Sequence, residues 1–228
     1  MLLEDTLVKD LALSRPGATA VFRRHRIDFC CNGAVPLREA AAKRGLDAAA
    51  LAQELVAATS PPQEAAPKQP SALIAYILEN FHDVHRRELE ELIRLARRVE
   101  AVHKEHPACP HGLGAFLEET AEELEAHMQK EEAVLFPMLG RGLGAMAGMP
   151  MQCMRLEHTE HGQRLEELAR LTSDFTPPQG ACTSWRALYA GCAKLDGDLR
   201  EHIHLENNLL FPMFESVDPQ VCGCGGAH

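Results

Sequence analysis

An internal repeat is the sequence feature that most constrains the fold of this chain. The segment HMQKEEAVLFPM, which begins at His127, returns as HIHLENNLLFPM from His202, with His, Glu, Leu, Phe, Pro and Met at the same offsets. A His-x-x-His pair precedes each copy at a similar distance, in FHDVH around His82 and in LEHTEH around His158. Repetition of the whole pattern predicts two equivalent halves, each built from two helices.

Apolar periodicity after the first 70 residues predicts four long helices. From Ser71 over about 35 residues, apolar residues recur at spacings of three and four, the pattern of an amphipathic helix. Three further segments are predicted to be helical: about Leu113–Leu139, a segment from near Met151, and about Cys182–Phe214. Prolines and glycines separate them, in HPACPHG, in GRGLGAMAGMP and in TPP. This order predicts an up-and-down four-helix bundle over residues 71–216.

The other segments differ in composition. Residues 1–59 contain short helical patterns broken by proline and glycine, which predicts a small cysteine-bearing domain of three or four helices, one of them capped by Asp47. Residues 60–70 include four prolines and predict an extended linker. Residues 217–228 predict a flexible tail, in which Cys222, Cys224 and His228 either capture a metal or have no function. The chain as a whole is predicted to be all-α.

Composition excludes several classes of partner. Aromatic residues are only 5% of the chain, while Leu, Ala, Glu and Arg are plentiful, a balance that favours helices over sheets. The formal net charge of −10 argues against a nucleic acid or an anionic membrane as a partner. The sequence has no apolar run of the roughly 18 residues that a membrane span requires. Its acidic start also lacks the features of a secretory signal, so we expect a cytoplasmic protein with reduced thiols.

The repeated His-x-x-x-Glu element carries the chemistry. Its spacing of four places His127 with Glu131, and His202 with Glu206, on one helix face. Six flanking apolar residues predict that this face points into the bundle: Leu124, Val134, Leu135, Leu199, Leu209 and Leu210. An unpaired carboxylate there would cost several kcal/mol, and a metal ion offsets that cost. One such pair alone is typical of an ordinary helix surface, but two copies facing the histidines of the partner helices predict a metal site.

Imidazole with carboxylate suits iron, manganese or zinc better than calcium or magnesium. The two-fold repeat predicts two ions, each held by two histidines, with both glutamates bridging them. We predict iron, with room for an oxo or hydroxo bridge and for a small ligand such as oxygen or nitric oxide.

Other candidate residues have less definite interpretations. His85 and His161 either substitute for ligands, support them, or are partly exposed without a role. Glu157 is either an acid that supports the site or lines a path to it, or an ordinary solvated residue. Four histidines are predicted to be surface residues: His103, His106, His111 and His204. Four cysteines are predicted to be packing residues: Cys109, Cys153, Cys182 and Cys192. The methionines near 146–154 are predicted to pack and to fill the loop.

Taken together, the motifs resemble the repair-of-iron-centres family, the ScdA/YtfE-type di-iron proteins with a hemerythrin-like bundle. The resemblance covers almost the whole chain and includes FRRHRIDFCCNG from Phe22 as well as the motifs above. It implies that the terminal iron ligands are His82, His127, His158 and His202, and that Glu131 and Glu206 bridge the irons. It also draws attention to Cys30 and Cys31, either as thiols for iron, nitrosyl or redox chemistry or as packing residues at a left-handed turn supplied by Asn32 and Gly33.

The resemblance further implies a role under nitrosative and oxidative stress, in which the di-iron centre supplies iron to damaged iron–sulfur proteins. This describes an iron-donating repair protein more than a classical enzyme. Two alternatives remain open: a binding protein that scavenges nitric oxide or oxygen, and a nitric oxide reductase, which needs an electron donor that the sequence does not reveal. A monomer and a homodimer both fit the sequence.

Overall fold

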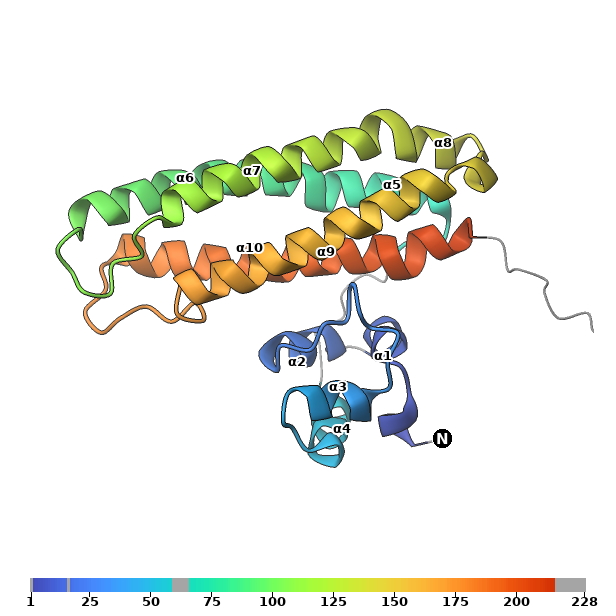
Figure 1. The fold of residues 1–228 in the computed structure, drawn as a ribbon, viewed down its shortest axis with the longest axis horizontal. Coiled ribbons are helices and arrows are strands. Elements are labelled where there is room, and N and C mark those ends of the chain that lie inside the picture. Colours follow the sequence, from blue (N-terminus) through green and yellow to red (C-terminus); the bar gives the residue numbers. More distant parts are fainter. Residues whose placement is uncertain (1, 16, 59–65, 216–228) are drawn as a thin grey trace, which may run out of the picture.

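The computed structural model describes residues 2–15, 17–58 and 66–215. These residues form a long four-helix bundle and a small N-terminal helical part that lies beside it (Figure 1). The prediction of an all-α chain is confirmed. Within the described ranges, no helix is long and apolar enough to cross a membrane.

The bundle consists of four long helical stretches, called rods below, and three of them are built from several helical segments joined end to end. The first joins α5 (Pro70–Ile77), a π-helical segment (Leu78–His82) and α6 (Asp83–Val102). The second joins α7 (Leu113–Lys130), a π-helical segment (Glu131–Leu135) and α8 (Phe136–Gly140). A 3-10 turn (Gly144–Met146) precedes the third rod, α9 (Gly148–Leu171). The fourth joins α10 (Thr183–Leu205), a π-helical segment (Glu206–Leu210) and a 3-10 turn (Phe211–Met213).

Two details at the ends of the rods differ from prediction. Pro70, expected in the linker, is the first residue of α5, because a proline at this position loses no intrahelical hydrogen bond and its φ already suits a helix. Met146 and Met149 were predicted to pack, but they are 70% and 77% exposed. Residues 60–65 of the predicted linker and the whole predicted tail, residues 217–228 with Cys222, Cys224 and His228, lie outside the described residues.

The small N-terminal part contains four short α-helices after a 3-10 turn (Leu3–Asp5). Their bounds are α1 Val8–Ser14, α2 Ala18–Arg24, α3 Leu37–Lys43 and α4 Ala48–Ala57. Asp47 caps α4 as predicted, since its carboxylate accepts the backbone N–H groups of Ala49 and Ala50 at 2.8 and 3.3 Å.

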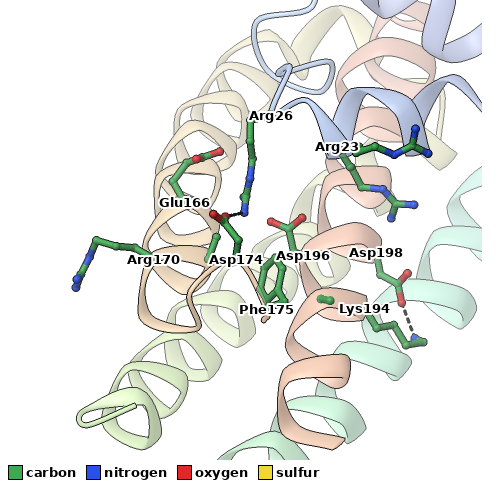
Figure 2. A pocket seen from close by; sticks show the side chains of 12 residues that line it. Arg23, Arg26, Glu166, Arg170, Asp174, Phe175, Lys194, Asp196 and Asp198 are labelled. Atoms are coloured by element: carbon green, nitrogen blue, oxygen red, sulfur yellow. Dashed lines mark hydrogen bonds and ion pairs between the residues drawn. The ribbon is translucent and has the colours of Figure 1, made fainter. Parts of the chain in front are cut away.

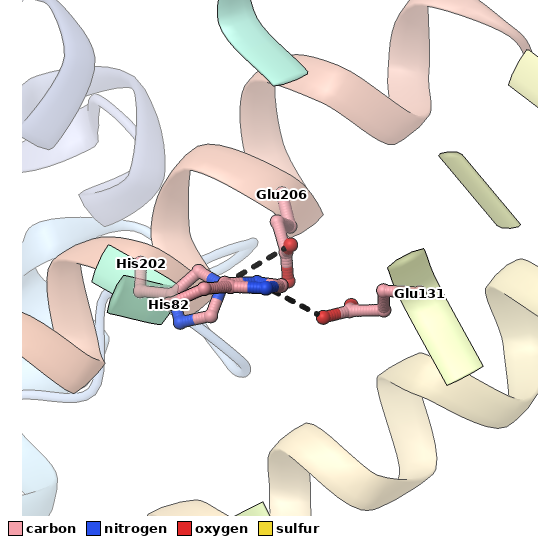
Figure 3. Close-up of side chains that lie close together, drawn as sticks. All are labelled: His82, Glu131, His202 and Glu206. Carbon is pink, nitrogen blue, oxygen red and sulfur yellow. Dashed lines mark hydrogen bonds and ion pairs between the residues drawn. The ribbon is translucent and has the colours of Figure 1, made fainter. Parts of the chain in front are cut away.

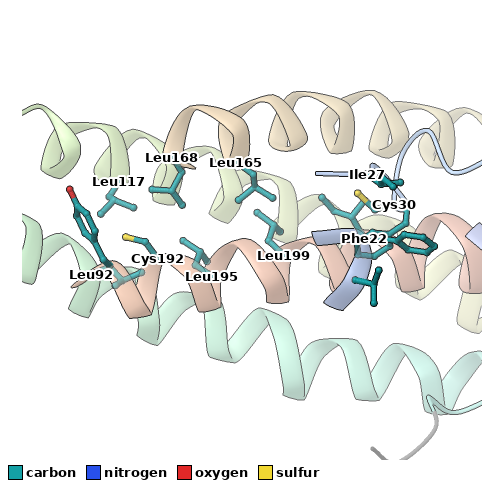
Figure 4. Close-up of a cluster of buried hydrophobic side chains, with 14 of the residues drawn as sticks. Phe22, Ile27, Cys30, Leu92, Leu117, Leu165, Leu168, Cys192, Leu195 and Leu199 are labelled. Atoms are coloured by element: carbon teal, nitrogen blue, oxygen red, sulfur yellow. The ribbon is translucent and has the colours of Figure 1, made fainter. Parts of the chain in front are cut away.

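The apolar core is divided into two clusters. The larger runs from the small N-terminal part into the bundle, so that Phe22 and Ile27 belong to one packed unit with Leu165 and Leu199 (Figure 4). The smaller cluster occupies the other end of the bundle, around Ile77, Phe136 and Phe211. The buried histidines and glutamates of the bundle belong to neither cluster.

Polar contacts hold the small N-terminal part against the bundle. The side-chain amides of Asn207 and Asn208 donate to the carbonyl oxygen of Cys30 at 3.2 and 3.1 Å. The ring of Phe29 lies edge-on to His204, with ring centroids 5.3 Å apart. His204 was predicted to be a surface residue, and it is buried because this docked part covers it.

A charged cleft of about 920 Å³ lies between α2 and the helices α9 and α10 (Figure 2). Arg26 forms an ion pair with Asp174 across it, and Lys194 pairs with Asp198 at 2.6 Å on the bundle side. Ion pairs this exposed contribute about 0–1 kcal/mol each, so the apolar cluster is the stronger link between the two parts.

Candidate metal centre

The two repeated glutamates each begin a π-helical segment. Glu131 opens the segment that ends at Leu135, and Glu206 opens the one that ends at Leu210. A π turn contains one more residue than an α turn and occurs frequently at functional sites. The extra residue changes which side chains point into the bundle in the turn that follows each glutamate.

This shift explains two side chains that were predicted wrongly. Leu135 and Leu210 are buried as predicted, at 1% and 0% exposure. Val134, also predicted to face inward, is 51% exposed, and Leu209 is only half-buried. Position four after each glutamate, not position three, continues the inward face, because a π turn has been inserted.

Six predicted residues converge in two overlapping groups. Ligand atoms of His82, Glu131, His202 and Glu206 all lie within 4.8 Å of one another (Figure 3). Those of His127, Glu131, His158 and Glu206 do the same. Both glutamates belong to both groups, and all six side chains are buried. The structure thus places two adjacent candidate metal positions with two shared carboxylates.

The spacing of the imidazoles suits metal ligands. His82 Nε2 and His202 Nε2 are 3.2 Å apart, and so are His127 Nε2 and His158 Nε2. Two nitrogen ligands at right angles on one ion, each at about 2.1 Å from it, lie about 3 Å apart. Carboxylate oxygens approach the same nitrogens, for example Glu206 Oε2 at 3.0 Å from His158 Nε2.

The carboxylates themselves lack other partners. Both oxygens of Glu131, and Oε2 of Glu206, are buried and have no hydrogen-bond partner among the described residues other than these imidazoles. Such groups are costly to bury unless a counter-charge satisfies them. Four imidazole nitrogens around two carboxylates form a donor set that suits non-haem iron, so the residues present fit a pair of iron ions.

Three of the four imidazoles have a hydrogen-bond partner at their second ring nitrogen, Nδ1. His82 Nδ1 lies 2.8 Å from Glu132 Oε1, and His158 Nδ1 lies 2.9 Å from Asn207 Oδ1. His127 Nδ1 lies 2.8 Å from Glu157 Oε2, and the other oxygen of Glu157, Oε1, accepts from Lys130 Nζ at 2.7 Å. An Nδ1–H bond fixes the tautomer that leaves Nε2 free to bind a metal. Sequence reasoning raised Glu157 but missed Glu132 and Asn207, although each directly follows a repeated glutamate.

The electrostatics of the cluster couple its imidazoles to its carboxylates. Burial opposes a charge on His127, but the carboxylate of Glu131 outweighs it and raises the pKa of His127 to about 9. Burial and the Glu206 charge oppose ionisation of Glu131, yet the His127 and His82 imidazoles keep its pKa below its ordinary value. The carboxylates are therefore charged at neutral pH, the form that binds a metal.

His85 and His161 lie one turn beyond ligand-type histidines. They are 0% and 4% exposed, so the reading in which they are partly exposed is wrong. The ring of His85 is 5.5 Å from that of His202, and the ring of His161 is 4.9 Å from that of His127. Burial lowers the pKa of His161 to about 3, which keeps that ring neutral. Of the other predicted surface histidines, His111 is exposed, whereas His103 and His106 are half-buried against Trp185.

The vicinal cysteines adjoin the metal-centre helix α9. Cys31 Sγ lies 3.5 Å from the backbone oxygen of His158, and the two sulfur atoms are 3.7 Å apart. Asp28 Oδ1 accepts the backbone N–H groups of Cys30 and Cys31 at 3.1 and 2.9 Å. The neighbouring Cys31 thiol, then burial, raises the pKa of Cys30 well above its ordinary value. Asp28, Cys30 and Cys31 also form a third group with the spacing of a metal site.

The left-handed turn considered for Asn32 and Gly33 is absent, since neither has a positive φ. Gly33 is required for a different reason, because a Cβ there would lie 2.6 Å from the backbone oxygen of Phe29.

A Gly33→Ala change is therefore expected to destabilise the small N-terminal part by about 1–3 kcal/mol, the usual cost of an overpacked site. Gly140→Ala is the matched control, since nothing lies within 4 Å of a Cβ added there. Denaturant unfolding of both variants tests this expectation, and equal midpoints would contradict it.

The isolated cysteines differ in environment. Cys109 and Cys192 are buried as predicted, Cys182 is half-buried, and Cys153 is exposed and is therefore not a packing residue. Burial raises the pKa of Cys192 to about 12. At neutral pH this lowers its thiolate fraction about 1,000-fold, so a brief alkylation of native protein should label Cys153 and leave Cys192 unlabelled. Peptide mass spectrometry measures the two sites, and denatured protein, in which both react, is the control.

A four-helix bundle with a buried, duplicated histidine–glutamate cluster defines a hemerythrin-type metal-binding protein. Residues 73–214 match the family model of the hemerythrin HHE cation binding domain, and residues 4–59 match the ScdA_N model, a domain of unknown function (DUF542). The iron-sulfur cluster repair protein YtfE of Yersinia pseudotuberculosis serotype IB (strain PB1/+) is 49% identical over 205 residues, which is 89% of this chain and 93% of that protein. Its namesake from Musicola paradisiaca (strain Ech703) is 50% identical over 208 residues, with the same coverage. The chain belongs to the YtfE family.

Proposed function

We propose that this chain repairs damaged iron–sulfur clusters and that it does so by donating iron from a two-iron site. His82 and His202 hold one ion, His127 and His158 hold the other, and Glu131 and Glu206 bridge both. The observation that carries the proposal is that each glutamate belongs to both candidate metal groups. The curated name of the relatives supports the repair role.

The residues around the site suit an ion that is held and then given up. The imidazoles are neutral ligands once deprotonated, and the two carboxylates balance only part of the charge of two ferrous ions. Iron held in this way is the cargo of the protein. The iron is released when protons take its place on the imidazoles and carboxylates, or when competing thiolates replace these ligands on the iron.

The vicinal cysteines are the proposed first acceptors outside the bundle. The Cys31 thiol lies 3.5 Å from the backbone of the ligand-type residue His158. Thiolates are preferred ligands of iron in clusters, and a metal ion deprotonates a thiol that coordinates it, so the raised pKa of Cys30 does not oppose this role. We therefore assign Cys30 and Cys31 a role in passing iron from the bundle to a recipient protein.

The test is an anaerobic transfer experiment. Iron-loaded protein is mixed with an iron–sulfur enzyme that nitric oxide has damaged, and both the recovered activity and the iron left on this chain are followed. Recovery matched by iron loss is expected. Unchanged enzyme activity with both irons retained would overturn the proposal.

A second candidate function is the binding of nitric oxide or oxygen. The rings of Phe81 and Phe211 stack on His202 and His158 at centroid distances of 5.4 and 6.1 Å, which gives the site dry, apolar walls that suit a small uncharged ligand. In the transfer experiment this function predicts a nitrosyl spectrum with no loss of iron. A nitric oxide reductase would in addition consume nitric oxide catalytically when a reductant is supplied.

We place this activity in the cytoplasm, where thiols stay reduced. The six cysteines in the described residues are free, in keeping with that compartment. Damaged iron–sulfur proteins are the proposed partners, and size-exclusion chromatography with light scattering distinguishes a monomer from a homodimer.

A further inference from the structure

The sequence repeat gives each imidazole of the metal centre a counterpart in the other half. His82 corresponds to His158, and each is held through Nδ1 by the residue that directly follows a shared glutamate. For His82 this residue is Glu132, and for His158 it is Asn207. In this first pair the two halves match in the position of the acceptor, which is a carboxylate oxygen for His82 and an amide oxygen for His158.

The second pair does not match. His127 corresponds to His202, and Glu157, the residue just before His158, accepts the Nδ1–H of His127 at 2.8 Å. The equivalent residue, just before His82, is Phe81. Its ring stacks on His202 at 5.4 Å with an interplanar angle of 16°. His202 Nδ1 is buried and has no hydrogen-bond partner in the described part of the chain.

This difference affects how firmly each ion is held. A carboxylate on Nδ1 orients the ring, fixes the tautomer and makes Nε2 a better donor, and loss of such a partner typically weakens metal binding by about 10–100-fold. At the position of His127 and His158, both imidazoles have an Nδ1 partner. At the position of His82 and His202, only one of the two imidazoles has such a partner.

We propose that the two metal positions are inequivalent, and that the ion held by His82 and His202 is the one that leaves first. Phe81 and Glu157 set this order as positioning residues. Glu157 acts on the metal through the His127 ring, whose Nδ1 it binds, and Phe81 acts through the His202 ring, on which it stacks. The inference rests on the proposed two-iron site and names which of its ions is given up.

The experiment measures iron, not repair activity. Ferrous-loaded protein is held anaerobically with a ferrous chelator, and the iron retained is followed against time and chelator concentration. Wild-type protein is expected to lose one ion about 10–100-fold more readily than the other. Glu157→Leu removes the partner of His127, so both ions should leave at similar chelator concentrations. Phe81→Glu supplies the missing acceptor, so both should be retained.

Two further variants separate positioning from structural damage. Glu157→Gln keeps an oxygen near His127 Nδ1 and should restore most of the retention of the slow ion. Glu160→Leu removes an exposed carboxylate from the same helix and should leave both phases unchanged. Circular dichroism checks folding, and if Phe81→Glu does not fold, the comparison of Glu157→Leu with Glu157→Gln decides.

The possible outcomes are distinguishable. Loss of two irons in a single phase from wild-type protein, or a slow phase that persists in Glu157→Leu, would overturn the inference and leave the two-iron site intact. Wild-type protein that never holds two irons would instead refute the proposed site itself.

Discussion

Glu131→Ala is expected to lose both iron ions, because the Glu131 carboxylate belongs to both candidate metal groups. Iron analysis after anaerobic reconstitution measures the loss. Metal binding stabilises a folded protein by about 4 kcal/mol when the free metal is at 1,000 times its dissociation constant. The variant should lack this stabilisation, so adding ferrous iron should no longer raise its melting temperature.

The same variant should also be less stable without iron. Glu131 is 0% exposed, and the His127 and His82 imidazoles hold its pKa below its ordinary value, so its carboxylate is paired inside the metal-free bundle. Removing one partner of a buried ion pair leaves the other partner uncompensated, so denaturant unfolding of metal-free Glu131→Ala should show a loss of about 3–5 kcal/mol relative to metal-free wild type. Glu122→Ala removes an exposed carboxylate from the same helix and is the matched control. Full iron content in Glu131→Ala would show that this residue does not bridge the ions.

Phe29→Ala is expected to destabilise the small N-terminal part by about 3–5 kcal/mol, the usual cost of deleting a buried aromatic ring. Phe29 is 0% exposed and packs against Phe22 and, across the interface, against His204. The iron content should stay unchanged, because the six candidate ligands belong to the bundle. Repair activity should fall, since Cys30 and Cys31 would no longer be held against α9.

Limited proteolysis followed by mass spectrometry measures this effect, with new cleavage expected within residues 2–58. Leu13→Ala, at a position 44% exposed, is the control and should leave the digestion pattern unchanged. If Phe29→Ala lost its iron together with its N-terminal part, the two parts would be energetically inseparable and this prediction would be wrong.

Much of the site was accessible from the repeat alone. A residue four positions after another on a helix shares its face, so His127 with Glu131 could be paired without a structure. Duplication of that pair, with His82 and His158 on the preceding helices, predicted which side chains converge. The structure brings these side chains together. Their role as iron ligands stays a prediction until metal is measured.

The π-helical segments could not be predicted from the sequence. A π-helical segment has no distinctive composition, since it forms where tertiary packing compensates for a strained turn. The insertion after Glu131 therefore exposed Val134, which an ideal helix would have buried. Leu135, one residue further on, stays in the core as predicted.

Burial of several histidines was also decided by neighbours distant in the sequence. Nothing near His204 in the sequence indicates that Phe29 will cover it, and the two are brought together only by docking of the N-terminal part. The same applies to Asn207, which holds both the His158 ring and the Cys30 backbone. Contacts between residues this far apart leave no periodic signal.

The sequence by itself determined the helical class of the chain, the four rods of the bundle and the identity of the converging histidines and glutamates. The helical class, the four rods and the two His-x-x-x-Glu pairs follow from periodicity or repetition along the chain, which local geometry converts directly into a helix face. The choice of His82 and His158 over His85 and His161 came from the resemblance to the repair-of-iron-centres family. The tertiary structure decided how the site is supported. It placed the Glu157 carboxylate at Nδ1 of His127 and the Phe81 ring on the face of His202, because each of these partners comes from a different helix than the imidazole it contacts.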